Sequence, residues 1–333
     1  MYKEITVSLD IPNLVGKDVI RRFQPDLIHA TSPGFLVLLS IIYSRIFNIP
    51  LVISYHTHLP VYAKKYVRFV PGIENLAWKI IQFWHKFADL TLVTSSQVQR
   101  ELLRKGVSNV DVWQKGIDTE RFHPKYFDEH MRTLMTNGNT DCFLMLYVGR
   151  LGLEKRLEDL KPILESMPNA RLAIVGDGPQ REHLEAFLST TNRVHFTGKL
   201  YGEDLSRAFA SADVFVMPSD SETLGFVVLE SMASGVPVVA ARAGGIPDLI
   251  QNNETSFLVE TGNTSSFVDR LRLLQDNAFR INMGKKARRE AERWNWSDAT
   301  SRLRNIQYEQ AIFNFESRQP ILSTTISGLF PTN

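Results

Sequence analysis

The sequence has few cysteines and no long apolar run. Its single cysteine, Cys142, excludes an internal disulfide framework and a cysteine-rich metal site. The longest apolar stretch runs from Phe35 to Tyr43 and is interrupted by Ser40, so it is too short to span a bilayer and predicts a buried helix. Residues 1–10 lack the apolar core of a signal peptide and do not resemble a transit peptide.

The chain also has no strong excess of one charge. Its 333 residues, 44% hydrophobic and 22% charged, suit a soluble globular protein with room for two domains. The net charge of +2 hides an asymmetry, because residues 1–115 carry 14 lysines and arginines against 8 acidic residues. This basic part favours an anionic membrane surface or an acidic substrate. Solvated surface charge is the alternative.

A complete dinucleotide-binding fingerprint is missing as well. Residues 171–179 predict a strand followed by a glycine turn at Gly176 and Gly178, but Arg181 occupies the position of the last glycine. This departure counts against a nicotinamide-binding oxidoreductase, which is the alternative from another enzyme class.

Short buried strands alternate with helices along the chain. Examples are Leu27–Ala30, Leu51–Ser54 and Phe143–Val148. This alternation predicts doubly wound α/β domains, whose ligands bind beyond the carboxyl ends of the strands. Pro124 and the polar residues 137–140 are expected to mark the region between two such domains.

The most informative stretch is residues 217–248. The strand Val214–Val216 leads into a polar turn, Ser219–Thr223, whose oxygen-bearing side chains are expected to cap a helix start. The helix is expected to begin near Leu224 and to stop at Gly235, before a second buried strand.

The start of this helix has the features of a diphosphate site. Gly225 permits a close backbone approach, so the amides of Gly225, Phe226 and Val227 can point at an anion with help from the helix dipole. Glu222 and Glu230 stand on either side. An ordinary strand-helix-strand unit with two solvated glutamates is the alternative. The glycine between the glutamates favours the diphosphate site.

Residues 221–240 closely resemble the E-x7-E signature of the large retaining, nucleotide-sugar-dependent glycosyltransferase family of GT-B fold. The resemblance implies that Glu230 binds the ribose hydroxyls and that Glu222 contacts the donor sugar. It also implies that the amides from Gly225 to Val227 hold the diphosphate, with Leu224 in the same donor-binding segment.

The family resemblance assigns further residues. In the family, an arginine and a lysine at this spacing neutralise the leaving diphosphate, and Arg150 and Lys155 match them; ordinary surface charge is the alternative. Gly149 permits a tight exit from the preceding strand, and Gly178 is assigned to donor binding. His56 matches a histidine that contacts the donor sugar.

His56 and His58 form a His-x-His pair, a pattern that can bind metal. No other histidine or cysteine cluster nearby completes a site, so neither a metal nor a cofactor is expected. A buried structural role is the alternative for each histidine.

Several stretches narrow the resemblance to the sulfolipid synthases of photosynthetic membranes, and residues 54–62, S-Y-H-T-H-L-P-V-Y, are the most specific. This resemblance covers residues 20–315. It implies transfer of sulfoquinovose from a UDP-sugar donor to diacylglycerol, no nucleic-acid partner, and a plastid membrane or, in a bacterium, the cytoplasmic face of the membrane. Candidate cations for the sulfonate are Arg242, Lys64, Lys65 and Arg68.

Two alternatives remain within this interpretation. One is another lipid or polysaccharide glycosyltransferase that uses UDP-glucose or GDP-mannose. The other is a catalytically inactive, membrane-associated fragment that still binds UDP.

Residues 62–87 mix aromatic and basic side chains. Part of the segment predicts the core face of a helix, and the rest suits peripheral contact with a membrane interface, with a solvated face as the alternative. The residues expected on the core face are Ala77, Ile80, Ile81, Trp84 and Ala88.

The expected architecture is α/β of GT-B type, with two doubly wound Rossmann-like domains facing a cleft. Residues 1–120 form the acceptor-side domain, 121–300 the nucleotide-sugar-binding domain, 301–317 a helix returning to the first domain, and 318–333 a disordered tail. Nothing before Pro25 supplies the opening strand and glycine loop of the family, so the first domain is expected to be truncated at its N-terminus.

Overall fold

The computed structural model describes residues 15–32, 34–67 and 69–318, which fall into two compact units. Among these residues, unit 1 takes those up to 94, then 98–113 and those from 300 onward, and unit 2 takes 95–97 and 114–299. The chain leaves unit 1 after Trp113, whereas we expected the first domain to end at residue 120. Residues 1–14 and the tail beyond 318 lie outside the described part.

The described strands of unit 1 form a parallel sheet in the order β1-β2-β3-β4. The two central strands are fully buried, as is typical of parallel strands that are covered on both faces. The strands are β1 (Ile28–Ser32), β2 (Leu51–Tyr55), β3 (Leu90–Val93) and β4 (Val110–Val112). The helices before and between them are α1 (Val15–Phe23), α2 (Phe35–Phe47), α3 (Leu59–Tyr66), α4 (Ile73–His85) and α5 (Ser96–Arg104).

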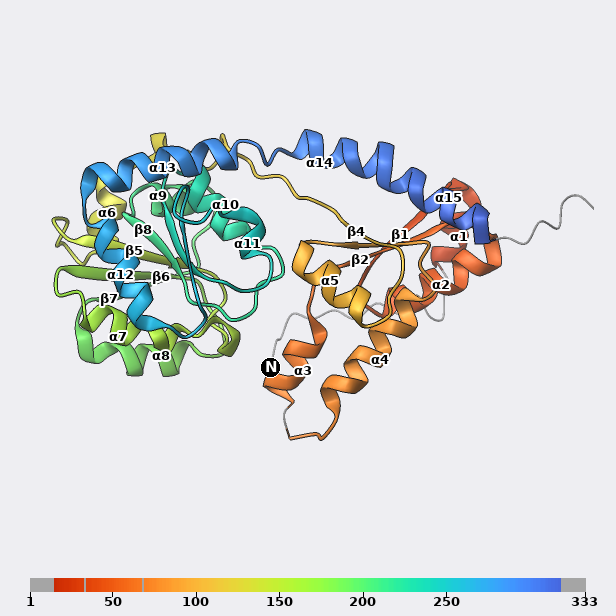
Figure 1. Cartoon of the computed structure of the whole chain (residues 1–333), viewed down its shortest axis with the longest axis horizontal. Coiled ribbons are helices and arrows are strands. Elements are labelled where there is room, and N and C mark those ends of the chain that lie inside the picture. Colours follow the sequence, from red (N-terminus) through yellow and green to blue (C-terminus); the bar gives the residue numbers. More distant parts are fainter. Residues whose placement is uncertain (1–14, 33, 68, 319–333) are drawn as a thin grey trace, which may run out of the picture. The chain divides into compact units, whose positions relative to one another are not determined.

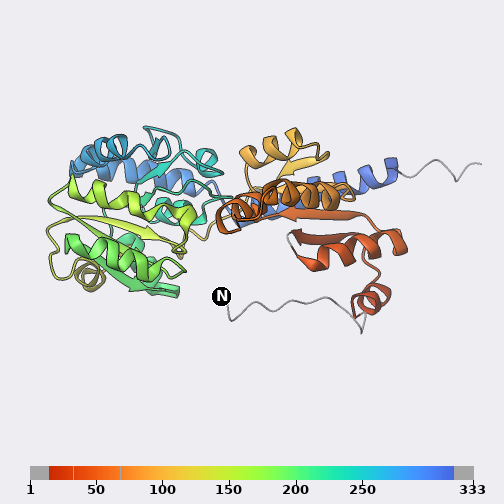
Figure 2. The same ribbon diagram turned by 90° about the horizontal axis from the view of Figure 1, so that it is seen from below.

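Both faces of this sheet are covered (Figures 1 and 2). Successive side chains of β2 point to opposite faces. Leu51 and Ile53 pack in a cluster with α2, whereas Val52 packs in a cluster with Leu303 and Ala311 from the end of the chain. The C-terminal helix therefore covers the face of the sheet opposite to α2.

A helix over residues 301–317 was expected, and the structure has a helical stretch that begins earlier and is divided into three segments. These are α14 (Trp296–Arg302), a π-helical turn (Leu303–Gln307) and α15 (Tyr308–Arg318). The π turn directs Gln307 toward β4, where its side-chain amide donates to Asp111 Oδ2 over 2.7 Å and to the Val112 carbonyl over 3.0 Å.

Unit 2 contains a parallel sheet of six strands in the order β10-β9-β8-β5-β6-β7. After β5, the chain adds β6 and β7 on one side of this strand. It then returns to the other side of β5 and adds β8, β9 and β10 there. The strands are β5 (Phe143–Val148), β6 (Ala170–Val175), β7 (Val194–Gly198), β8 (Val214–Met217), β9 (Val238–Ala241) and β10 (Phe257–Val259).

Helices cover both faces of this second sheet (Figure 1). One face carries α6 (Glu129–Met135), α9 (Gly202–Ala210), α10 (Phe226–Ala233) and α13 (Asn277–Ala291), which contact one another in pairs. The other carries α7 (Leu160–Glu165), α8 (Arg181–Leu188) and α12 (Thr264–Leu274), and the short α11 (Ile246–Leu249) follows β9. We did not expect α6, whose Met131 and Met135 belong to the core of unit 2.

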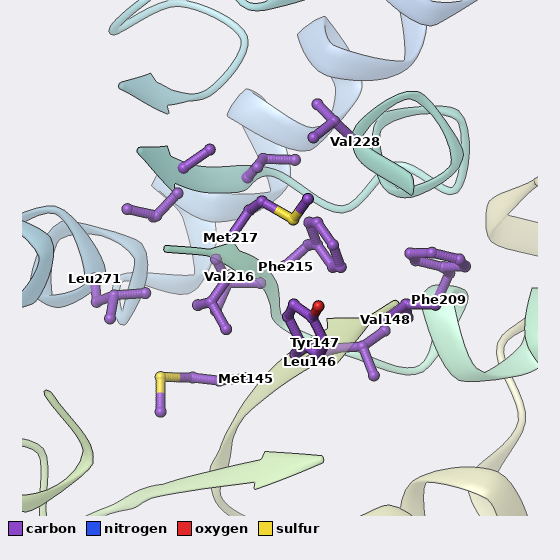
Figure 3. Packing of buried hydrophobic residues seen from close by; sticks show 14 of the residues in the cluster. Met145, Leu146, Tyr147, Val148, Phe209, Phe215, Val216, Met217, Val228 and Leu271 are labelled. Carbon is purple, nitrogen blue, oxygen red and sulfur yellow. The ribbon is translucent and has the colours of Figure 1, made fainter. Parts of the chain in front are cut away.

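The centre of this core is built from β5 and β8, as Figure 3 shows. All residues of both strands are buried. Phe215 of β8 packs against Phe209 of α9 with ring centroids 5.8 Å apart. Dense packing of this kind fixes the two strands rigidly, so the loops that follow them start from well-defined positions.

Candidate active site

The predicted site residues of unit 2 follow β5 and β8, which are neighbours at the centre of the sheet. Because the chain builds outward in opposite directions from these two strands, their carboxyl ends form a topological switch point, where open α/β sheets bind ligands. The loop after β5 carries Arg150 and Lys155, and the loop after β8 carries Glu222.

The loop after β5 turns sharply at Gly149, whose φ angle is +154°. The fully buried Tyr147 donates its hydroxyl to the carbonyl of Arg150 over 3.0 Å. Burial, together with the nearby Glu222 and Glu154 carboxylates, raises the pKa of Tyr147, so its hydroxyl keeps the proton that it donates. A hydrogen bond from a core side chain thus stabilises the turn.

The glycine turn after β6 supports this loop by close backbone contact. A Cβ atom at Gly176 would clash with the Gly149 carbonyl oxygen, and one at Gly178 would lie 2.5 Å from the carbonyl oxygen of Leu151. The amide of Leu151 donates to the Asp177 carbonyl over 3.0 Å. The two glycines are therefore explained by packing of one loop on another. Donor binding by Gly178 stays a prediction.

Lys155 and Glu222 meet at the switch point. The Lys155 ammonium lies 2.7 Å from Oε2 of Glu222, and the two side chains are only 13% and 16% exposed. Screening by water is weak at such burial, so the pair is stronger than a surface ion pair. The structure thus brings together two residues assigned to the donor from separate parts of the sequence.

The backbone of Glu154 joins the same two loops. Its carbonyl oxygen accepts the hydroxyl of Ser219 over 3.0 Å and the amide of Asp220 over 3.1 Å. The prediction that the polar turn caps the following helix was wrong. The Ser219 hydroxyl donates to Glu154 in the loop after β5 and to the Ser221 carbonyl within its own turn, and the cap residue of α10 is Gly225, without a side-chain cap.

Helix α10 begins as predicted at a glycine. Gly225 has a φ angle of +91°, in the left-handed region that favours glycine, and the amide of Val228 donates back to its carbonyl over 2.9 Å. The amides of Phe226 and Val227 lie in the first turn, where a helix has no internal acceptors for them. Leu224 is buried, so its side chain belongs to the core and a donor can reach only its backbone.

A second glycine turn, after β9, fixes the segment that carries Glu222. The amide of Gly245 donates to the Glu222 carbonyl over 2.9 Å. A Cβ atom at Gly245 would lie 2.7 Å from the Thr223 carbonyl oxygen, and one at Gly244 would clash with the Glu222 carbonyl oxygen. The sequence showed this turn, but its contact with the residues around Glu222 could be found only in the structure.

Glu230 lies on α10, one helical turn beyond the first turn. Its side chain is partly buried, and desolvation raises the pKa of its carboxyl group to about 7, with a smaller opposing effect of Arg121. A titratable group perturbed in this way is typical of a functional site, although structural groups can also be perturbed.

The loop after β5 also contains a residue that we did not single out. Glu154 is 2% exposed, and its Oε1 atom lies 3.6 Å from Nη1 of Arg150. In the sequence it stands in G-R-L-G-L-E-K, where a glutamate between bases predicts nothing more than a surface ion pair.

His56 and His58 lie in unit 1, after β2, and have different surroundings. His56 Nε2 is 3.1 Å from the hydroxyl of Ser54, and its ring meets that of Trp113 edge-on with centroids 6.3 Å apart. His58 is buried, and its Nε2 lies 2.8 Å from Oε2 of Glu101. His58 therefore has the structural role that was one of its alternatives, and His56 remains the residue assigned to the donor sugar.

The candidate cations for a sulfonate are spread over both units. Arg242 follows β9 and pairs with the exposed Glu260 over 3.1 Å, whereas Lys64 of unit 1 lies 3.4 Å from Glu74. Lys65 is also in unit 1, and Arg68 lies outside the described residues. Arg242 follows β9 in the sheet of unit 2, whose strands β5 and β8 lead into the loops of Arg150, Lys155 and Glu222.

The aromatic and basic segment is divided between core and surface. Ala77, Ile81 and Ala88 are buried as predicted, but Ile80 is 36% exposed and faces outward. Trp78 and His85 join Ala77 and Ile81 on the buried side of α4. The prediction for Ile80 was wrong because apolar residues stand on two neighbouring faces of α4, and helical spacing alone does not tell which of the two faces is buried.

Within the part of the chain that the structure describes, no helix combines the length and apolarity needed to cross a membrane. In the same residues, no three His, Cys, Asp or Glu side chains gather in a way that could hold a metal ion. The expectation that no metal takes part stays a prediction.

Two family profiles match the chain. The profile described as glycosyl transferases group 1 matches residues 136–290, which include every predicted site residue of unit 2. The profile of glycosyltransferase family 4 matches residues 13–121, which include His56.

Individual relatives of the chain are glycosyltransferases as well. The chain is 44% identical to a sulfoquinovosyl transferase of Arabidopsis thaliana over 99% of its own length and 66% of the relative's. It is 35% identical to a GDP-mannose-dependent alpha-mannosyltransferase of Mycobacterium tuberculosis, covering 78% of this chain and 67% of that protein. The chain thus spans about two thirds of the length of the curated relatives it matches.

Solved structures show the same fold. A sucrose-phosphate synthase from Thermosynechococcus elongatus is similar with a TM-score of 0.77 and 25% identity, over 90% of this chain and 77% of the other. Anabaena HepE in complex with UDP and glucose is similar with a TM-score of 0.76 and 22% identity, over 92% of this chain and 84% of the other. The predicted GT-B fold is confirmed, and the chain belongs to glycosyltransferase family 4.

Proposed function

We propose that the chain is a retaining glycosyltransferase that moves sulfoquinovose from UDP-sulfoquinovose to diacylglycerol. The observation that carries this proposal is the 44% identity to the Arabidopsis sulfoquinovosyl transferase over nearly the whole chain. The mannosyltransferase relatives share less of the sequence and use GDP-mannose by name, so transfer of another sugar is the main alternative.

The geometry of unit 2 supports binding of a nucleotide-sugar donor. Arg150 and Lys155 lie in the loop that follows the central strand β5, and the first amides of α10 lie beyond the end of the neighbouring strand β8. Backbone amides at a helix start and two bases form a suitable environment for a diphosphate. Glu230, farther along the helix, is the proposed partner of the ribose hydroxyls.

The proposed reaction breaks the bond between the sugar and the diphosphate while the acceptor hydroxyl attacks from the same face. The hydroxyl proton passes to an oxygen of the leaving diphosphate, and UDP is released. Negative charge grows on that diphosphate as the bond breaks. Preorganised donors aimed at growing charge lower the barrier, and Arg150, Lys155 and the amides of Phe226 and Val227 are assigned this role.

Arg242 is our candidate for contact with the sulfonate, because it follows β9 at the same sheet edge as the residues assigned to the donor. Its partner Glu260 is 75% exposed at the side chain, so the pair is weak and can be exchanged for a sulfonate. We expect Arg242→Gln to lower the rate with UDP-sulfoquinovose while leaving turnover of UDP-glucose, where measurable, unchanged. Equal losses with both donors would contradict the assignment.

The acceptor and the setting of the enzyme are also part of the proposal. Diacylglycerol resides in membranes, and unit 1 exposes aromatic and basic side chains near α3 and α4, including Phe69 and Phe83, which are 79% and 56% exposed. Such side chains suit the membrane interface. We propose peripheral contact with a plastid membrane through this segment.

Flotation of the chain with vesicles tests this contact. We expect binding to anionic phosphatidylglycerol vesicles, weak binding to phosphatidylcholine vesicles, and loss of binding when Phe69 and Phe83 are both changed to Ser. Retained flotation of a folded double variant would exclude this segment as the contact.

A donor panel tests the function itself. The chain is incubated with diacylglycerol vesicles and UDP-sulfoquinovose, UDP-glucose or GDP-mannose, and we expect glycolipid from UDP-sulfoquinovose. A parallel calorimetric titration with UDP should show binding that Glu230→Ala abolishes and that Glu254→Ala, at an exposed position, retains.

The alternatives give different outcomes. Product from GDP-mannose alone would identify a mannosyltransferase. UDP binding without product from any donor would favour the inactive UDP-binding fragment. If a folded chain binds NAD in place of UDP, the donor-site assignment is wrong.

A further inference from the structure

Glu154 is a buried carboxylate that the proposed reaction does not use. It lies between two residues assigned to the diphosphate, one residue before Lys155 and four after Arg150. With 2% exposure it is among the most buried acidic residues of unit 2. Removing a carboxylate from water is costly unless a cation offsets its charge, so this position calls for an explanation.

The side chain of Glu154 interacts with Arg150. Its Oε1 atom lies 3.6 Å from Nη1 of the guanidinium, and the Arg150 side chain is 32% exposed. The carboxylate is therefore on the inner side of this pair, and the arginine reaches from it toward solvent. An arginine anchored by a buried carboxylate keeps its orientation, because the anchor itself is fixed by packing.

The main chain of Glu154 fixes the other cation. Its carbonyl oxygen accepts hydrogen bonds from Ser219 and Asp220, which tie the loop after β5 to the loop after β8. Lys155 follows directly in the chain and pairs with Glu222, which belongs to the second of these loops. One residue thus contacts Arg150 through its side chain and aligns Lys155 through its backbone.

Gly152 provides the space for this arrangement. A Cβ atom at Gly152 would lie 2.5 Å and 2.6 Å from the two carboxylate oxygens of Glu154. Gly152 has φ −120° and ψ 161°, an extended conformation that any residue can adopt. The glycine is therefore required by the carboxylate beside it and not by its own backbone conformation.

We propose that Glu154 is a positioning residue that holds Arg150, and with it the loop bearing Lys155, where the terminal phosphate of a nucleoside diphosphate binds. The inference rests on the proposed function and deepens it. Glu154 acts through Arg150 and has no contact with the donor, so its effect should appear only with ligands that carry the terminal phosphate. UDP has this phosphate and UMP lacks it.

Calorimetric titration of the full chain with UDP and with UMP tests the proposal. We expect Glu154→Gln to weaken UDP binding about tenfold, as for loss of an ion pair in a poorly screened site, and to leave UMP binding within about twofold. In an Arg150→Ala background, Glu154→Gln should have no further effect on UDP. Glu165→Gln, the same change at an exposed position of α7, is the matched control and should leave both affinities unchanged.

A second variant disturbs the carboxylate without removing it. Gly152→Ala displaces the Glu154 carboxylate, which is the far end of a flexible side chain, and leaves every charge in place. It should reproduce the selective loss of UDP affinity. Because its backbone conformation suits alanine, this variant decides the question even if Glu154→Gln fails to fold.

The outcomes separate this inference from the proposed function. If the unchanged chain is folded and does not bind UDP, both are overturned. If it binds UDP, the positioning role alone is overturned by any of three results: unchanged or tighter UDP binding by both variants, equal losses for UDP and UMP, or a full effect of Glu154→Gln without Arg150.

Discussion

The ammonium of Lys155 and the carboxylate of Glu222 form a close ion pair, 2.7 Å long, between the loops that follow two adjacent strands. Family resemblance assigns these residues to different parts of the donor, the diphosphate and the sugar. A diphosphate that binds Lys155 therefore competes with Glu222 for the same cation. Release of Glu222 by the diphosphate would free it for the sugar, so the pair couples the two halves of donor binding.

Lys155→Ala should lower turnover on the order of 10²-fold or more, because it removes a preorganised positive charge from the leaving group. The measurement is the initial rate of glycolipid formation at saturating donor. Lys285→Ala on α13 changes an exposed lysine and should keep the full rate. An undiminished rate for Lys155→Ala would remove this residue from the mechanism.

Glu222→Gln should change binding and catalysis in opposite directions. Without the carboxylate, Lys155 no longer has a competing anion in a poorly screened site, so UDP binds several-fold more tightly. The transfer rate falls because the contact assigned to the donor sugar is weakened. Calorimetry with UDP and initial rates with the sugar donor measure the two effects separately. A parallel loss of both would show that Glu222 does not restrain Lys155.

Gly244→Ala should destabilise the chain far more than Gly202→Ala, although their φ angles of +56° and +59° are nearly equal. At Gly202 no other atom lies within 4 Å of an added Cβ, so the cost is that of a left-handed alanine, roughly 1–2 kcal/mol. At Gly244 the Cβ would also clash with the Glu222 carbonyl oxygen, and the segment bearing Glu222 must move.

Urea unfolding followed by circular dichroism measures the difference between these two glycine variants. We expect Gly244→Ala to lose several kcal/mol and most of its affinity for UDP, whereas Gly202→Ala retains its affinity. Equal stability losses would mean that the close contact at Gly244 relaxes without cost.

Much of unit 2 could be predicted from the sequence because its signals are local. The buried strand Phe143–Val148 was placed with the bounds that the structure has, and the glycine helix start at Gly225 follows from the demands of a left-handed cap. The stop at Gly235, with a φ angle of +73°, has the same physical basis.

Other parts of the site could not be predicted because they depend on contacts between distant segments. Lys155 and Glu222 are 67 positions apart, and only the order of strands in the sheet makes them neighbours. The role of Glu154 could not be predicted either, because nothing in the sequence distinguishes a buried glutamate from an exposed one. Helix α6 was missed because its polar surroundings suggested a linker.

The partly buried Glu230 should make the stability of the chain depend on pH near neutrality. Its pKa is about 7 in the folded protein and 4.5 in the unfolded reference, so between these values the folded form holds a proton that the unfolded form has lost. Protonation of Glu230 therefore stabilises the fold most at low pH, and this contribution disappears as the pH rises through 7.

Glu230→Gln keeps the group neutral at every pH and should remove this dependence. From pH 5 to pH 8, the free energy of unfolding of the unchanged chain should fall by about 2.5 kcal/mol relative to that of the variant, because the slope of 1.36 kcal/mol per pH unit applies only from pH 5 to the folded pKa of about 7. Urea unfolding at both pH values measures it, with Glu254→Gln as the exposed control. A constant difference between chain and variant would show that Glu230 ionises normally, and its carboxylate would then be ready to bind ribose hydroxyls at any physiological pH.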